Sequence, residues 1–155
     1  MDLITGVKCR LAKIDEVRAR IEPLLRAHFE EIAVHRDVTP LNPNWGHYYA
    51  VEKIDRLIVV AAENGPELIG YNVYFVSPML HNMSNLIAHN DIIYIKPEYR
   101  HGSLALRMIR MGEAQAKRLG ASIVSMHVKT GHDFSGLLRH VGYAEVDTTY
   151  FKVVA

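Results

Sequence analysis

The sequence has a single cysteine, Cys9, among its 155 residues. One thiol forms no intramolecular disulfide and no thiolate cluster for zinc or iron–sulfur, and it suits a reducing compartment. The sequence also has no apolar run of about 18 residues, the length that indicates a membrane span. Its N-terminal run MDLITGVKCRLAK has no long apolar segment with a cleavage site, as a secretory signal would have. We therefore expect a cytoplasmic protein without a membrane segment.

An excess of charge of one sign is missing as well. Lys and Arg number 18 and Asp and Glu 17, which gives a formal net charge of +1. Proteins that bind nucleic acid broadly carry a stronger basic excess, so we do not expect nucleic acid as a partner. The nine histidines show no spacing typical of metal ligands, and we expect no bound metal. With 49% hydrophobic residues, a chain of this length is typical of one globular domain, residues 1–155.

Hydrophobic periodicity predicts a mixed α/β domain. The predicted strands cover residues 6–11, 56–63, 67–76, 90–96, 121–128 and 143–154. The predicted helices cover residues 15–34, 48–53, 103–119 and 134–140, and the polar segment 77–85 is typical of a loop. The order contains one strand–helix–strand crossover in the middle of the chain. The final strand is apolar and near a sheet edge, and because exposed edges tend to be paired, it predicts a homodimer.

The junction between the strand 90–96 and the helix 103–119 is a candidate binding site. It reads Pro97-Glu98-Tyr99-Arg100-His101-Gly102-Ser103-Leu104-Ala105. A strand, a tight turn of small residues and a helix N-terminus together favour an anion, because free backbone N–H groups and the positive end of the helix dipole attract phosphate. Small side chains let the backbone approach it closely. The junction therefore predicts a pyrophosphate site.

The run from Ile93 to Ala105 resembles motif A of the GNAT superfamily of N-acetyltransferases. That motif is Gln/Arg-x-x-Gly-x-Gly/Ala, preceded by a strand that ends in an apolar residue, any residue, and Pro. Arg100 fills its first position and Ala105 its last. Ser103 stands where the family usually has glycine, and Gly102 comes one position earlier. A serine amide can still donate there, and the hydroxyl adds a donor.

A second resemblance lies near the end of the chain. The pair Gly142-Tyr143 is similar to the Gly-Phe/Tyr pair that ends motif B of the same family. With the order of predicted elements, the resemblance covers essentially the whole sequence. It implies a mixed, mostly antiparallel sheet flanked by helices, in which the central strands 90–96 and 121–128 are splayed apart.

The resemblance further implies acetyl-coenzyme A as the acyl donor. The backbone amides of the turn would hold its pyrophosphate, and these belong to Arg100, His101, Gly102, Ser103, Leu104 and Ala105. The pantetheine arm would lie between the splayed strands and bond, like an added strand, to the backbone of Ile93, Tyr94 and Ile95. The implied reaction is transfer of the acetyl group to a primary amine of a small molecule or peptide by direct attack.

Direct attack needs a neutral amine, and the family often carries a base about ten residues before the first position of motif A. That region here is His89-Asn90-Asp91. His89 and Asp91 lie on one face of the strand because side chains alternate. A histidine with a pKa of ~6.5 suits a base at neutral pH, and an aspartate would accept a proton or orient a cationic amine. Alternatively, Asp91 bonds its own loop and His89 is a solvated residue at the strand end.

The irregular segment before residue 50 is rich in aromatic residues. Trp45, Tyr48 and Tyr49 either line the acceptor pocket, as the variable second helix and its loop do in the family, or pack the loop onto the sheet edge. The sequence leaves both interpretations open.

A further position departs from the family. Leu138 stands where a tyrosine usually protonates the leaving thiolate. His132, Tyr143 or water would supply that proton, and a thiol with a pKa near ~8.5 can also leave without a dedicated acid. This departure keeps an alternative open: a catalytically weak or inactive domain that binds coenzyme A or acts as a structural or protein-interaction module.

Overall fold

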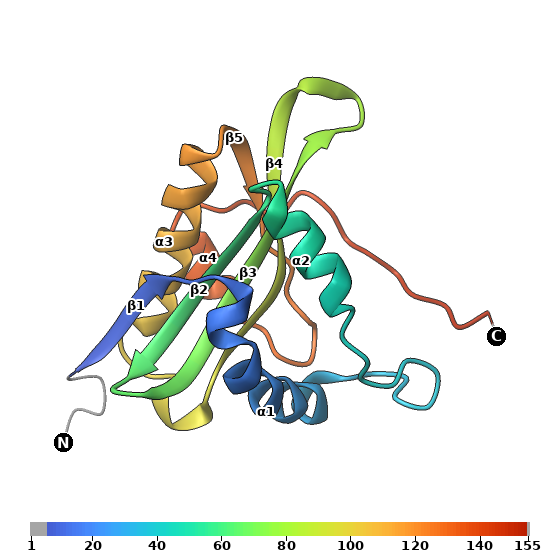
Figure 1. Cartoon of the computed structure of the whole chain (residues 1–155). Helices are drawn as coiled ribbons and strands as arrows, with labels where there is room; N and C mark the ends of the chain where they lie inside the picture. The colour runs from blue at the N-terminus through green and yellow to red at the C-terminus, as the bar shows by residue number, and fades with distance from the viewer. Residues whose placement is uncertain (1–5, 155) are drawn as a thin grey trace.

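The computed structural model describes residues 6–154 and shows a curled sheet flanked by helices (Figure 1). The strands are β1 (Val7–Leu11), β2 (Leu57–Asn64), β3 (Glu67–Met79), β4 (Asn82–Ile95) and β5 (Ala121–Ser125). The helices are α1 (Ile14–Ile32), α2 (Trp45–Lys53), α3 (Leu104–Arg118) and α4 (Ser135–His140), with a 3-10 turn at Pro97–Tyr99.

The sheet runs in the order β1-β2-β3-β4-β5. Its first four strands pair antiparallel, and β4 pairs parallel with β5. α3 joins the two parallel strands, which is the predicted strand–helix–strand crossover. The mixed, mostly antiparallel fold expected from the sequence is therefore confirmed.

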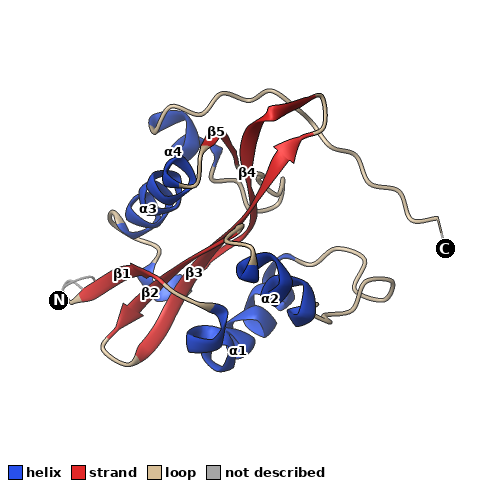
Figure 2. Cartoon of the chain, turned by 45° about the horizontal axis from the view of Figure 1, so that its top comes forward, coloured by secondary structure: helices blue, strands red, loops and turns tan. Residues whose placement is uncertain are grey.

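Helices cover both faces of the sheet (Figure 2). On one face, Leu104 and Met108 of α3 are buried against β2 and β3. On the other face, Val17 and Ile21 of α1 are buried against the same strands, and α2 packs beside them. Among residues 6–154, no helix is both long and apolar enough to cross a bilayer.

α3 lies directly against the sheet at Gly112. A Cβ atom built there would lie 2.4 Å from Cε2 of Tyr74, whose ring is fully buried in β3. The glycine is therefore required by packing, although glycine is a poor helix former.

We expect Gly112→Ala to lower the free energy of unfolding by about 1–3 kcal/mol, because the overpacked ring and helix must separate. Gly136→Ala is the matched control, since a Cβ at that helical glycine meets nothing within 4 Å. The control is expected to be neutral or slightly stabilising. Urea unfolding of the two variants measures both effects. A Gly112→Ala protein as stable as the wild type would show that α3 can move away from the sheet without loss of unfolding free energy.

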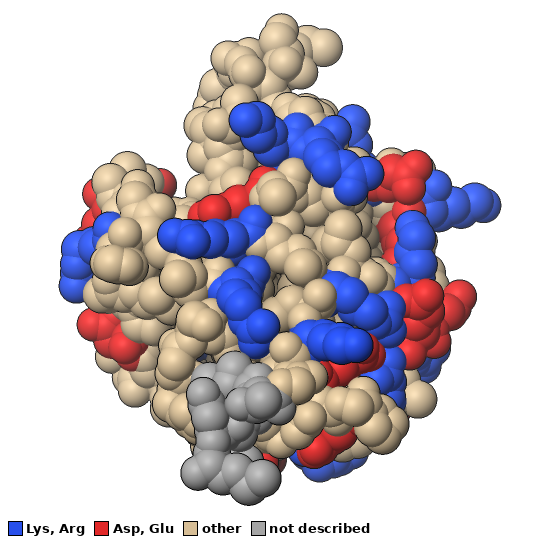
Figure 3. All heavy atoms as spheres, turned by 90° about the vertical axis from the view of Figure 1, so that its left-hand side faces the viewer, with Lys and Arg blue, Asp and Glu red and all other residues tan. Residues whose placement is uncertain are grey.

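The predicted loop 77–85 is wrong. β3 continues to Met79, β4 begins at Asn82, and only Leu80 and His81 form the turn between them. The polar residues of this segment suggested a loop, but the segment pairs as a hairpin that projects beyond the sheet (Figure 1). The projecting hairpin carries no Lys, Arg, Asp or Glu, whereas charges of both signs are mixed on the face of β1 and α3 (Figure 3).

The predicted final strand, residues 143–154, is also wrong. These residues form no strand, and residues 144–154, here called the C-terminal arm, are exposed throughout. The arm leaves the domain and ends far from it in two views (Figures 1 and 2). β5 consequently ends at Ser125 and is half-exposed, in place of the predicted buried strand 121–128. The homodimer inferred from that final strand stays a prediction.

Candidate functional site

The candidate site is built around a fork between β4 and β5. The two strands pair from Leu86 and Ala121 to His89 and Ser125. Beyond this point β4 continues to Ile95, and no strand among residues 6–154 pairs with that side. The splay expected between the central strands is therefore present. It leaves backbone groups along that edge of β4 available to an extended ligand, except the carbonyls of Ile92 and Ile95, which accept from Asn90 (3.4 Å) and Arg100 (2.7 Å).

A β-bulge lies at the start of the fork. Ile92 pairs with Val73 and Asn90 pairs with Tyr74, so Asp91 is an extra residue with no partner on β3. Such bulges re-aim side chains and are frequent near active sites. Here the bulge presents the half-buried Asp91 to α2, where its carboxylate meets Tyr48.

The buried side-chain amides of Asn90 and Asn72 hold the bulge in place. The side-chain amide of Asn90 donates to the carbonyl oxygen of Val73 (3.1 Å) and to Oδ1 of Asn72 (2.7 Å). Asn72 in turn donates to the hydroxyl of Tyr74 (2.8 Å). Asn72, Tyr74 and Asn90 are all buried, and buried polar groups hold their geometry when their partners are fixed. The position of Asp91 is therefore set by the core.

Tyr48 connects α2 to the bulge. Its hydroxyl donates to Oδ2 of Asp91 over 2.5 Å. Burial, followed by the adjacent carboxylate, raises the pKa of Tyr48, so the phenol stays protonated and remains a donor at neutral pH. A carboxylate that accepts a charge-assisted bond is well oriented and keeps further lone pairs for a cationic amine.

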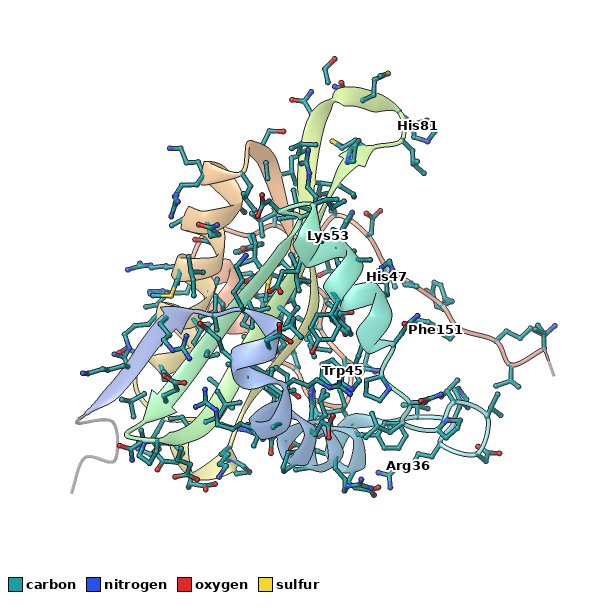
Figure 4. All side chains as sticks on the ribbon, viewed as in Figure 1. Arg36, Trp45, His47, Lys53, His81 and Phe151 are labelled. Atoms are coloured by element: carbon teal, nitrogen blue, oxygen red, sulfur yellow. The ribbon has the colours of Figure 1, made fainter. Side chains whose placement is uncertain are left out.

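Aromatic rings cluster around Tyr48, the residue that holds this carboxylate. The Tyr48 ring lies 5.4 Å from that of Phe75 and 5.7 Å from that of Trp45, and the His47 ring lies 5.5 Å from Phe75. Figure 4 shows Trp45 and His47 on α2. Tyr49 turns to α1, where the guanidinium of Arg18 lies 6.0 Å from its ring. Arg18 lies closer still to the Trp45 ring (5.0 Å), so Tyr48 joins Asp91, whereas Trp45 and Tyr49 both pack against α1.

His89 lies at the fork itself. It pairs with Phe75 across the ladder, and its Nδ1 forms a 2.7 Å hydrogen bond with Oγ of Ser125 on β5. His89 is exposed and shares the α2 side of the sheet with Asp91. The two predicted candidates are thus on the same face, each with its own partner. Sequence reasoning did not identify Phe75 and Ser125, the two partners of His89, because these contacts depend on strand register.

The turn after β4 carries unused backbone donors. Gly102 adopts a left-handed φ of 72°, and the first hydrogen bond of α3 runs from the N–H of Arg107 to the carbonyl of Ser103 (2.9 Å). Within residues 6–154, the amides from His101 to Leu106 donate no hydrogen bond. The amide of Arg100 is different, because it donates to Pro97 (3.2 Å). Five of the six predicted amides, His101 to Ala105, are therefore free for an anion.

The side chain of Arg100 has a structural partner. Its two terminal nitrogens donate to the carboxylate of Glu31 at the end of α1, both over 2.6 Å, and Nε donates to the carbonyl of Ile95 (2.7 Å). The guanidinium also lies 5.2 Å from the Tyr94 ring. The Arg100 hydrogen bonds lower the pKa of Glu31 and keep it ionised. Arg100 thus braces the turn against α1, a contact that the sequence did not indicate.

The residues considered for the leaving group are dispersed. Leu138 is buried at 6% exposure, and Nδ1 of His132 lies 3.7 Å from Glu31. The buried hydroxyl of Tyr143 has no hydrogen-bond partner in the described part of the chain, and burial raises its pKa. No three His, Cys, Asp or Glu residues between 6 and 154 gather to hold a metal ion.

Comparisons with known proteins agree with this geometry. Residues 21–143 match a family model described as "Acetyltransferase (GNAT) family". No curated protein matches the sequence significantly. An aminoglycoside acetyltransferase from an uncultured soil metagenomic sample has a TM-score of 0.76 at 13% identity, with 97% of each chain covered.

Two other solved structures are similar. Glucosamine-6-phosphate N-acetyltransferase from Arabidopsis thaliana has a TM-score of 0.74 at 12% identity, covering 96% of this chain and 99% of that one. Ribosomal-protein-alanine N-acetyltransferase from Brucella melitensis biovar Abortus 2308 has a TM-score of 0.68 at 16% identity, covering 95% and 97%. At these identities the likeness shows a shared fold.

Proposed function

Because the chain belongs to the acetyltransferase (GNAT) family, we propose that it transfers an acetyl group from acetyl-coenzyme A to a primary amine by direct attack on the thioester. One observation carries the proposal. The segment of β4 from Asn90 to Ile95, which has no partner on its β5 side within residues 6–154, joins a fixed carboxylate, Asp91, at one end to a turn with five free amides at the other. At about 3.3 Å per residue this segment spans roughly 20 Å, enough for an extended donor to lie along it.

The donor site consists of main-chain groups. The free amides from His101 to Ala105, at the N-terminus of α3, suit a pyrophosphate because they combine N–H donors with the positive end of the helix dipole. The backbone of Ile93 to Ile95 would bond the pantetheine arm. Acetyl-coenzyme A supplies the activated acyl group, and this chain supplies position and charge.

The acceptor site consists of side chains. Asp91 would attract the ammonium form of the acceptor and take one proton from it, and Tyr48 keeps the carboxylate in place. The nitrogen lone pair then attacks the thioester carbon, a C–N bond forms and the C–S bond breaks, and the second proton of the nitrogen passes to the departing thiolate, which leaves as the thiol. Phe75 and Trp45 would flank the carbon part of the acceptor. Small-molecule and peptide amines both meet these requirements.

A second candidate follows from Leu138. This buried leucine occupies the place where the family usually has its proton donor. A domain that binds coenzyme A with little or no turnover, as a structural or interaction module, would tolerate that change.

The test combines binding and turnover. Acetyl-coenzyme A should raise the melting temperature, because it binds the folded state. Thiol release should depend on both the protein and an amine, in a panel containing an aminoglycoside, glucosamine-6-phosphate, a diamine and a peptide with a free N-terminus. A raised melting temperature without thiol release for any amine favours the binding module. Indifference to millimolar acetyl-coenzyme A overturns both functions.

A further inference from the structure

An apolar groove lies on the projecting hairpin, beside the candidate site. Its volume is about 700 Å³, within the roughly 300–1,000 Å³ that is usual for small-molecule sites. The lining includes residues of both strands and of the turn between them: Ser77, Met79, Leu80, His81, Ile87 and His89. Figure 4 shows His81 at the tip of the hairpin, the far end of this groove. Of these residues, only His89 belongs to the candidate site.

The groove is continuous with the acceptor side of that site. Ser77 pairs with Ile87, and the next pair on the same face of the sheet is Phe75 with His89. The Phe75 ring lies 5.4 Å from that of Tyr48, whose hydroxyl bonds the carboxylate of the bulge. Because a strand advances about 3.3 Å per residue, the Ser77–Ile87 pair lies roughly 10–13 Å from that carboxylate. A small molecule can therefore reach both places at once.

The groove carries no Lys, Arg, Asp or Glu, and the site beside it offers one carboxylate. β3 and β4 have no residue of these four types from Leu68 to Asn90, and Asp91 ends this run. α2 has Glu52 and Lys53 only in its last turn, and Glu52 accepts from the N–H of Ile14 on α1. A second ammonium group or a phosphate placed in the groove would meet no opposite charge, which is costly. The charges thus favour an acceptor with a single amine and an uncharged body.

Main-chain groups contribute little to the groove. β3 and β4 pair with each other along the hairpin, from Phe75 and His89 to Met79 and Asn82, so their hydrogen bonds lie within the sheet. A peptide laid on this face would leave its own N–H and C=O groups without protein partners. A hydrocarbon chain has no such groups, and the flexible side chain of Met79 adapts to its shape. The groove therefore suits a small apolar body.

We propose that the acceptor is a small primary monoamine with a hydrocarbon tail, and that this groove binds the tail. The inference rests on the proposed acetyl transfer and names its substrate class. The ammonium group sits at Asp91. The tail runs past Phe75 and lies over the Ser77–Ile87 pair. The groove thereby selects the acceptor by its apolar body, while the bulge holds the reacting nitrogen.

Chain length tests the groove with thiol release as the readout. Each methylene that leaves water should lower KM about twofold to fourfold, so octylamine should have a KM roughly 20–200-fold below that of butylamine, which is too short to reach Ser77. The aminoglycoside, glucosamine-6-phosphate and the peptide should all be poorer acceptors than octylamine. Equal KM values for the two alkylamines, or better turnover of any of those three polar acceptors, overturns the proposal.

A second charge at the end of the tail gives a sharper test. The diamine with the same eight-carbon chain should have a kcat/KM about 10-fold or more below that of octylamine in the wild type, because its far ammonium group is unpaired in the groove. Ser77→Asp places a carboxylate there, so the preference should invert toward the diamine. A gain of activity with one amine cannot come from misfolding.

Ser84→Asp is the matched control for this inversion. Ser84 is exposed on the same hairpin but does not line the groove, so its replacement should keep the wild-type preference for octylamine. An unchanged preference in Ser77→Asp, or the same inversion in Ser84→Asp, overturns the proposal.

Binding separates this proposal from the proposed reaction. Calorimetric titration with octylamine in the presence of coenzyme A, in place of acetyl-coenzyme A, needs no transfer. Tighter binding of octylamine than of butylamine without any thiol release keeps the groove and overturns the transfer. Thiol release that is indifferent to the tail does the opposite. Octylamine binding that weakens as the protein concentration rises would show that a second copy covers the groove, which also overturns the proposal.

Discussion

Asp91→Asn is expected to reduce kcat for acetyl transfer by about 10²–10⁴-fold, the usual cost of losing a general base. Asparagine keeps the size of the side chain and can still accept the Tyr48 hydrogen bond, but it carries no charge to attract or deprotonate an ammonium group. The melting-temperature shift caused by acetyl-coenzyme A should be unchanged, because the proposed donor site consists of main-chain groups. Thiol release with the best amine of the panel measures the effect.

Asp55→Asn is the control for this variant. Asp55 is exposed and has a φ of 54°, a backbone conformation that asparagine also tolerates, so activity should be unaffected. Full activity of Asp91→Asn with the wild-type pH profile would remove Asp91 from the reaction. His89→Gln tests the second candidate in the same way. If the two residues form one relay, the double variant should lose no more activity than the worse single variant.

Ser103→Glu is expected to abolish the response to acetyl-coenzyme A. At 100-fold excess over Kd, a ligand stabilises the wild type by about 2.7 kcal/mol, a rise in melting temperature of roughly 5–10 °C for a domain of this size. A carboxylate among the free amides would compete for their N–H groups and would repel the negatively charged pyrophosphate. It should not unfold the protein, because Ser103 is exposed and an acidic residue at a helix N-terminus is stabilising.

Ser103→Ala is the matched control for this second variant. It keeps the amide and removes only the hydroxyl, so most of the melting-temperature shift should remain. A Ser103→Glu protein that still responds fully to acetyl-coenzyme A would show that the donor phosphates bind elsewhere.

Local patterns in the sequence predicted the parts of the site that are local in the fold. The turn from Arg100 to Ala105 is a strand–turn–helix junction, whose signals lie within a dozen residues. The bulge at Asp91 was not predictable, because it exists only relative to β3. The ion pair between Arg100 and Glu31 joins residues 69 positions apart, and no short pattern reports it.

The C-terminal arm shows a different limit. Its β-branched and aromatic residues favour an extended backbone. A strand also needs a neighbouring strand to pair with, and residue propensity alone does not predict which strand that is. Hairpin residues 77–85 were misjudged for the opposite reason. Their polar side chains are typical of loops, yet they pair because β3 and β4 simply extend past the layer of helices.

The bulge also has an evolutionary meaning. Asp91 is an insertion of one residue in an otherwise regular ladder, and its neighbours Asn90 and Ile92 already pair with adjacent residues of β3. Deleting its codon would leave those neighbours on their present faces and in their present register, so the sheet would close over the gap. The proposed base thus occupies a single added position that a lineage can gain or lose without redesigning the scaffold, which would give such a domain a short genetic path between catalyst and binding protein.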